Sequence, residues 1–197
     1  MKMTKWICIL LSACLFFSPL PAHAGANILP SDIFLVIMLK ALSYDRNIDR
    51  LSEGKIVIGV VYINGDKQAQ DFAWKIKDNF ANIQSQSQIK NLPTEIKVLS
   101  FDKNVSRETF EEQLQQNHLS AVVVASQDPG INKIIFETTR KLAVNSICYS
   151  SACVEEGAGL GIFLKDNSPR MVVNLQVVKQ EGSDYNARFL ALCEVVK

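Results

Sequence analysis

Three runs with the pattern of β-strands, each followed by a helical pattern, constrain the fold of this chain more than any other feature. The runs at residues 55–62 and 120–126 are apolar almost throughout, as in strands buried on both faces, whereas residues 94–101 alternate. Helical patterns follow each run, beginning near Asp66, Ser106 and Asp128. This alternation is typical of right-handed crossovers in a parallel sheet covered on both faces.

The last third of the chain departs from that alternation. Apolar runs at residues 160–164 and 171–175 are separated by only six residues, which favours an antiparallel hairpin. Residues 145–149 could add one more strand, and two short helical segments follow, the second at residues 187–193. We therefore predict a three-layer, Rossmann-like α/β domain with a mixed sheet of about six strands, helices on both faces and a C-terminal antiparallel hairpin.

The first 24 residues follow the layout of a secretory signal peptide. Lys2 and Lys5 precede an apolar run at residues 6–17, and a small-x-small pattern ends at Ala24. We predict cleavage between Ala24 and Gly25, a single domain over residues 25–197, and a periplasmic location. An uncleaved N-terminal anchor is the alternative, but about a dozen apolar residues are too few to cross roughly 30 Å of hydrocarbon.

The charge and histidine content argue against several function classes. The formal net charge is only +1, so nothing in the composition attracts nucleic acid or an anionic membrane broadly. After cleavage His118 is the only histidine, and an exposed helix end accounts for it. The glycine-rich run at residues 157–161 lacks the Lys-Ser/Thr of a phosphate-binding loop and leads into a strand. We expect no enzymatic activity, no cofactor, no metal site and no nucleic-acid partner.

The first helix and the segment after it are candidates for a partner or dimer interface. Residues 31–42 are apolar on all sides, so this helix is either enclosed in the core or covered by another subunit. In the second case Phe34 and Ile37 would lie in a homodimer interface. The polar segment that follows would form either an exposed recognition patch or a solvated turn, and it contains Tyr44, Asp45 and Arg46.

Polar residues follow the first and third strands and are candidates for a ligand pocket. In open α/β sheets, ligands bind outside the carboxyl ends of the strands where the strand order reverses. The residues at these positions are Asn64, Asp66, Gln127 and Asp128. Turn formation and helix capping are the alternative roles of the two aspartates.

Three cysteines remain after signal cleavage. Cys148 and Cys153 are close in sequence, and in an oxidising compartment a local disulfide is expected. A redox-sensing role for this pair is the alternative. Cys193 lies among apolar residues, as an inert buried thiol does.

The C-terminal forty residues resemble the YfiR/HmsC-like periplasmic family. The resemblance lies in Gly157-Ala158-Gly159-Leu160, an apolar strand and polar turn, Val173-Asn174-Leu175, Gly182 and the apolar ending at residues 188–196. Members often carry a Trp-Pro pair after the first helix, where this chain has Tyr44-Asp45-Arg46-Asn47. The resemblance implies a soluble, dimeric, disulfide-containing periplasmic repressor that binds the sensory portion of an inner-membrane diguanylate cyclase and so restrains cyclic-di-GMP synthesis and biofilm formation.

We therefore expect a regulatory binding protein. A small-solute receptor that serves an ABC transporter or a sensor kinase is the alternative, and an envelope structural or assembly protein is a third class.

Overall fold

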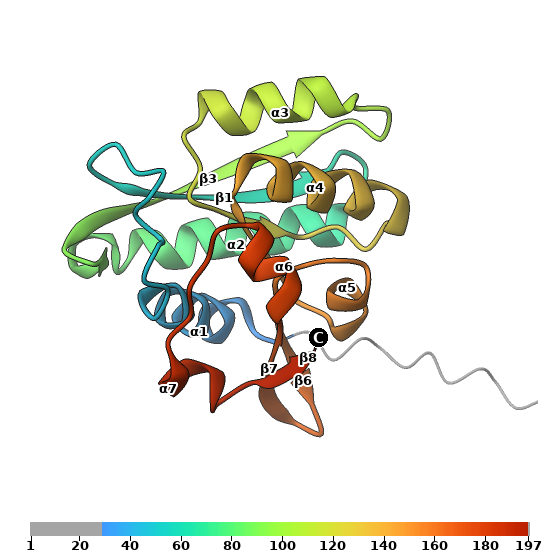
Figure 1. Cartoon of the computed structure of the whole chain (residues 1–197). Helices are drawn as coiled ribbons and strands as arrows, with labels where there is room; N and C mark the ends of the chain where they lie inside the picture. The colour runs from blue at the N-terminus through green and yellow to red at the C-terminus, as the bar shows by residue number, and fades with distance from the viewer. Residues whose placement is uncertain (1–28, 197) are drawn as a thin grey trace, which may run out of the picture.

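The computed structural model describes residues 29–196, which form one eight-stranded sheet with helices on both faces (Figure 1). The strands are β1 (Ile56–Ile63), β2 (Gln88–Ile89), β3 (Leu92–Phe101), β4 (Ala121–Val124), β5 (Asn145–Cys148), β6 (Leu160–Lys165), β7 (Ser168–Asn174) and β8 (Glu194–Val196). The α-helices are α1 (Ser31–Ser43), α2 (Lys67–Ala81), α3 (Arg107–Gln116), α4 (Pro129–Leu142), α5 (Ser151–Glu155), α6 (Leu175–Gln180) and α7 (Ala187–Leu190), and a 3₁₀ turn covers Gln84–Gln86.

The strand order is β2-β3-β1-β4-β5-β6-β7-β8. Strands β3, β1, β4, β5 and β6 run parallel, whereas β6 and β7 form the predicted antiparallel hairpin. The mixed α/β fold is therefore confirmed, but the predicted number of strands is wrong. The two additional strands, β2 and β8, lie at the edges and have two and three residues, too few to show a periodic pattern.

Two apolar layers cover the sheet, one on each face. Alternate residues of β1 divide between them: Ile58 and Val60 face α1 and α2, whereas Val57 and Val61 face α3 and α4. Figure 1 shows α3 and α4 on one side of the central strands and α1 and α2 on the other. The continuous apolar runs of β1 and β4 follow from this arrangement, because both of their faces are buried.

Helix α1 belongs to the core, which decides between the two alternatives given for Phe34. Phe34 is fully buried, and its ring meets that of Phe72 on α2 at 5.4 Å between centroids. The prediction that Phe34 lies in an interface is therefore wrong, because α2 already covers this side of the helix. Ile37 is only partly buried, and Val36 is 61% exposed on the outer face.

The predicted signal-peptide cleavage site, Ala24 and Gly25, lies outside the described residues. Among residues 29–196, no helix combines the length and the apolar character that a membrane span requires.

Candidate functional site

The carboxyl ends of β1 and β4 form the point at which the direction of chain winding changes. These strands are parallel neighbours, with Val61 opposite Val124. The chain leaves β1 for α2 on one face of the sheet and leaves β4 for α4 on the other. The first residues of both helices therefore lie at the same edge of the sheet, which is where open α/β sheets bind ligands. We call this region the switch-point edge and define it by Asp66, Gln127, Asp128 and Tyr149.

The two aspartates of the switch-point edge cap helices. Asp66 Oδ1 accepts a hydrogen bond from the Ala69 amide at 2.9 Å, and Asp128 Oδ1 accepts one from the Gly130 amide at 2.9 Å. Capping therefore explains the positions of both carboxylates, as the alternative prediction had it. Each still has a second oxygen that could accept a hydrogen bond from a ligand.

Asn64 lies on the opposite side of β1 from the switch-point edge. Its Nδ2 donates to Asp102 Oδ1 at 2.8 Å, and Asp102 follows β3 rather than β4. The structure thus brings Asn64 to a different strand pair from Gln127 and Asp128.

Tyr149 lies at the switch-point edge but was not predicted as a site residue from the sequence. Its hydroxyl donates to the carbonyl oxygen of Ala125 at 3.2 Å, and its ring lies 5.0 Å from that of Phe72. Burial raises the pKa of Tyr149, a hydrogen bond with Gln127 opposes the increase, and the charge of Asp66 adds to it. The rule that selected Gln127 missed Tyr149 because the expected strand covers residues 145–149, whereas β5 ends at Cys148 and Tyr149 directly follows it.

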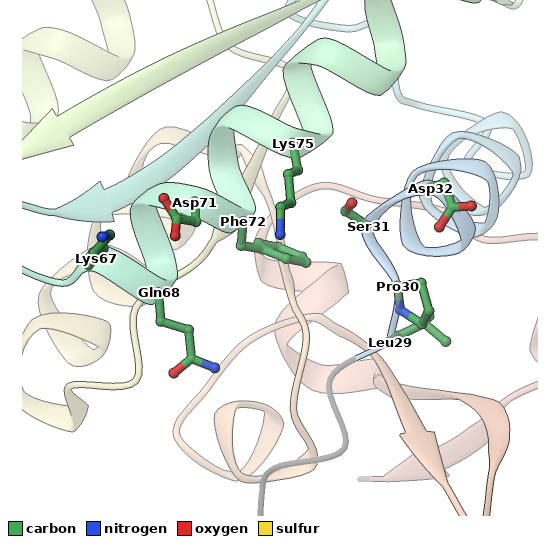
Figure 2. Close-up of a pocket in the computed structure, with 9 residues that line it drawn as sticks. All are labelled: Leu29, Pro30, Ser31, Asp32, Lys67, Gln68, Asp71, Phe72 and Lys75. Atoms are coloured by element: carbon green, nitrogen blue, oxygen red, sulfur yellow. The ribbon is translucent and has the colours of Figure 1, made fainter.

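A pocket of about 660 Å³ lies beside this edge, between the beginning of α1 and the first half of α2 (Figure 2). Phe72 links the two features, since its ring lines the pocket and also contacts Tyr149. In Figure 2 the side chains of Phe72 and Lys75 extend from α2 towards Ser31 at the start of α1. The pocket is lined by Leu29, Pro30, Ser31, Asp32, Lys67, Gln68, Asp71, Phe72 and Lys75.

The charges of this pocket balance, because two lysines and two aspartates line it. Its side chains offer both hydrogen-bond donors and acceptors around one aromatic ring, a combination that suits a small polar or zwitterionic molecule better than a purely apolar one.

The predicted recognition patch divides into buried and exposed parts. The Asp45 side chain is fully buried and accepts hydrogen bonds from the Asn47 amide at 2.9 Å, the Asp184 amide at 2.8 Å and Asn145 Nδ2 at 2.8 Å. Its assignment to an exposed patch is therefore wrong, because this carboxylate satisfies buried amide groups. Arg46 is exposed and pairs with Asp184 at 3.1 Å.

Tyr44 is half-buried and has a packing role on the same side of the molecule. Its ring stacks on Phe189 of α7 at 5.7 Å between centroids.

His118 lies on the surface, at the loop that follows α3. Its Nδ1 is 3.2 Å from Glu53 Oε1, and both side chains are more than half exposed. Among residues 29–196, no group of three or more His, Cys, Asp and Glu side chains is arranged to hold a metal ion.

The glycine-rich run provides close packing. A Cβ atom on Gly159 would lie 2.7 Å from Glu181 Oε2, and one on Gly161 would lie 2.5 Å from Val154 Cγ2. Both distances are shorter than an unstrained contact allows. These contacts agree with the expectation that the glycines allow close packing and do not form a phosphate-binding loop.

Cys148 and Cys153 form the expected disulfide, with their Cα atoms 6.3 Å apart. It joins the end of β5 to α5, next to Tyr149, and both cysteines are buried. Cys193 is free and half-buried, and burial raises the pKa of its thiol to about 11.

Comparisons with known proteins identify the fold but no family. No protein-family model and no curated protein matches this chain. Three solved structures share the fold at 11–14% sequence identity. A conserved domain protein from Vibrio cholerae has a TM-score of 0.60, with 85% of this chain and 60% of that chain covered.

The other two structures are binding proteins or their domains. An "ABC domain in complex with L-Trp" from Streptococcus pneumonia has a TM-score of 0.56, with 79% of this chain and 60% of that chain covered. The ligand-free, open structure of a substrate binding protein with adhesive properties from Clostridium difficile has a TM-score of 0.53, with coverages of 77% and 57%. The chain thus spans less than two thirds of the length of each. At such low identities the likeness establishes the α/β fold alone.

Proposed function

We propose that this chain is a non-catalytic, periplasmic binding protein whose switch-point edge recognises its target, and that it acts as a regulator that represses an inner-membrane diguanylate cyclase. The observation that carries the binding role is the position of the exposed Gln127 at the switch-point edge, beside Tyr149 and between two helices on opposite faces of the sheet. The fold that this chain shares with two binding proteins supports the same role. The resemblance of the C-terminal residues to YfiR/HmsC-like proteins supports the regulatory role and the partner.

The mechanism of such a regulator is a shift between two conformations of the cyclase. A repressor that binds the inactive form more tightly increases its population, and release restores cyclase activity. No catalytic group is required, because the difference between the two binding free energies drives the change.

Cellular cyclic-di-GMP tests this proposal. We expect its concentration to rise when the gene is deleted and to fall again when the full chain is supplied. A chain that lacks residues 1–24, and so cannot be exported by the predicted route, should not restore it. An unchanged concentration after deletion would contradict the regulatory role, and rescue by the unexported chain would contradict its periplasmic site of action.

A pair of matched variants tests the edge itself. Gln127 is exposed at the edge, whereas Gln115 is exposed on α3, away from it. Gln127→Arg should prevent rescue, because it puts a bulky charge at the switch-point edge, and Gln115→Arg should rescue fully. Both variants must reach wild-type levels in the periplasm. Equal rescue by the two variants would rule out the edge as the recognition surface.

A small-solute receptor is the second candidate, and the pocket in Figure 2 is the observation that favours it. L-Tryptophan is a suitable first probe, since one structure with the same fold holds it. A ligand at 100 times its Kd would raise the free energy of unfolding by about 2.7 kcal/mol, which a thermal-shift titration detects. The shift should saturate and should weaken in Lys75→Glu. No saturable shift with L-tryptophan and a panel of other amino acids would contradict this alternative.

A further inference from the structure

A buried polar cluster, separate from the switch-point edge, joins the C-terminal segment (residues 181–196) to the rest of the domain. At its centre Asn145 Nδ2 donates to Asp45 Oδ2 at 2.8 Å, and Asn145 Oδ1 accepts from Arg50 Nη2 at 2.8 Å. Ser183 also donates to Asn145 Oδ1, and the Arg50 guanidinium donates to the backbone oxygen of Glu181. The segment is therefore attached to the loop after α1 and to β5 at one place.

Glu181 is the second fully buried carboxyl group of this cluster, beside Asp45. Its Oε1 lies 2.8 Å from Thr139 Oγ1 on α4, and its Oε2 accepts a hydrogen bond from the Ser146 amide on β5 at 3.0 Å. The charged and titratable groups around it are Arg140 on α4, Arg50 and Asp45 from the loop after α1, and Tyr185 on its own segment. In the described residues no cationic side chain bonds to its carboxylate.

The Thr139 hydroxyl distinguishes two protonation states of Glu181. It has one hydrogen, yet Thr139 Oγ1 lies 3.1 Å from the carbonyl oxygen of Phe136 as well as 2.8 Å from the carboxylate. A protonated Glu181 donates to Thr139 Oγ1 and leaves the bond to Phe136 intact. An ionised Glu181 takes the single hydrogen for itself, and the Phe136 carbonyl loses this partner.

We propose that Glu181 is a proton-dependent latch, which holds the C-terminal segment against α4 and β5 as a neutral carboxylic acid and loosens the segment when it ionises. Complete burial raises its pKa from 4.5 to about 7, although hydrogen bonds from Ser146 and Thr139 lower it. Because the pKa in the folded state exceeds that in the unfolded state, the contribution of Glu181 to stability is complete below pH 4.5. It is lost as the pH rises through about 7.

Opening of the segment would expose apolar surface. Phe189 of α7 is fully buried and contacts both Tyr44 and Tyr185, whose rings lie 5.7 and 4.7 Å from its own. Figure 1 shows α7 beside α1, at the end of the segment that follows α6. A rise in pH therefore favours a form in which the apolar surface around Tyr44 is uncovered.

Hydrogen exchange measured by mass spectrometry tests the latch in the protein without residues 1–24. With pKa values of about 7 closed and 4.5 open, the opening equilibrium should increase roughly 70-fold between pH 5 and pH 8.5, after correction for intrinsic exchange rates. This increase should be confined to peptides from residues 183–196. Glu181→Gln should abolish it, because the glutamine amide donates to Thr139 as the protonated acid does and its oxygen accepts from Ser146.

Glu194→Gln is the matched control, since Glu194 is exposed on the same segment, and it should keep the wild-type pH dependence. An identical pH dependence in Glu181→Gln and wild type would overturn the proposal. Equal loss of protection in β1 and β4 would overturn it too. Carboxyl ¹³C NMR of the wild-type protein provides a measurement that does not depend on any variant: Glu181 should titrate near pH 7, and titration below pH 5 would overturn the latch.

Discussion

Replacement of Asp45 by alanine should destabilise the domain strongly, and this prediction separates a structural carboxylate from a recognition residue. The carboxylate is fully buried, bonds to three amide donors and lies 3.9 Å from Arg50. Its removal would leave the Asn47, Asp184 and Asn145 groups without this partner and Arg50 without its nearest acidic side chain. Loss of one member of a buried charged pair typically costs about 3–5 kcal/mol, and we expect a cost in that range.

Arg46→Ala is the matched control from the adjacent position. Arg46 is 64% and Asp184 50% exposed in their side chains, so water screens this ion pair. We expect Arg46→Ala to lower the free energy of unfolding by less than about 1 kcal/mol.

Urea denaturation followed by far-ultraviolet circular dichroism, at pH 6 and fixed salt, measures both variants. In thermal unfolding, the Tm of a domain of this size falls by about 2–4 °C for each kcal/mol lost from the free energy of unfolding. Asp45→Ala should therefore lower Tm by roughly 6–20 °C. A cost below about 1 kcal/mol for Asp45→Ala, or equal costs for the two variants, would refute the buried-cluster argument. Either result would favour the exposed recognition patch that was predicted for Asp45 from the sequence.

Three further predictions concern α1 and the cysteines. Phe34→Ala should lower the free energy of unfolding, measured by urea denaturation, by about 3–5 kcal/mol because it leaves a cavity in the core. Val36→Ala, on the exposed face of the same helix, should lower it by less than about 0.5 kcal/mol. Similar values for the two variants would place Phe34 outside the core. Reduction of the Cys148–Cys153 disulfide should lower the free energy of unfolding by roughly 2 kcal/mol, because this disulfide closes a loop of only six residues. In the oxidised protein at pH 7.5, Cys193 should react with a thiol reagent much more slowly than after unfolding in urea, since partial burial raises the pKa of its thiol to about 11. Equal rates would contradict this protection.

The layered α/β architecture could be predicted because its signals are local. Continuous runs of β-branched residues predicted β1 and β4. Asp66, Ser106 and Asp128 cap the helices that follow β1, β3 and β4. The edge strands β2 and β8 could not be predicted in the same way, since strands of two and three residues are too short to show a periodic pattern. The residues of α1 show a related limit: periodicity could not decide which apolar side chains α2 covers, and it led to the misplacement of Phe34.

The candidate sites show why charged residues are harder to place than apolar ones. Tyr44-Asp45-Arg46 looks like a solvated turn, yet Asp45 is buried, and two of its three amide partners come from residues 100 or more positions away, on β5 and after Gly182. The C-terminal residues that carry the family resemblance meet at the same place. Gly159 leaves room for the Glu181 carboxylate, and a Cβ atom on Gly182 would lie 2.9 Å from Arg50 Nε. These two glycines are thus explained by packing around a buried acid and a partly buried guanidinium. Packing within the domain therefore accounts for both glycines without a partner, and the regulatory role proposed above is best tested at the switch-point edge, where Gln127 remains exposed.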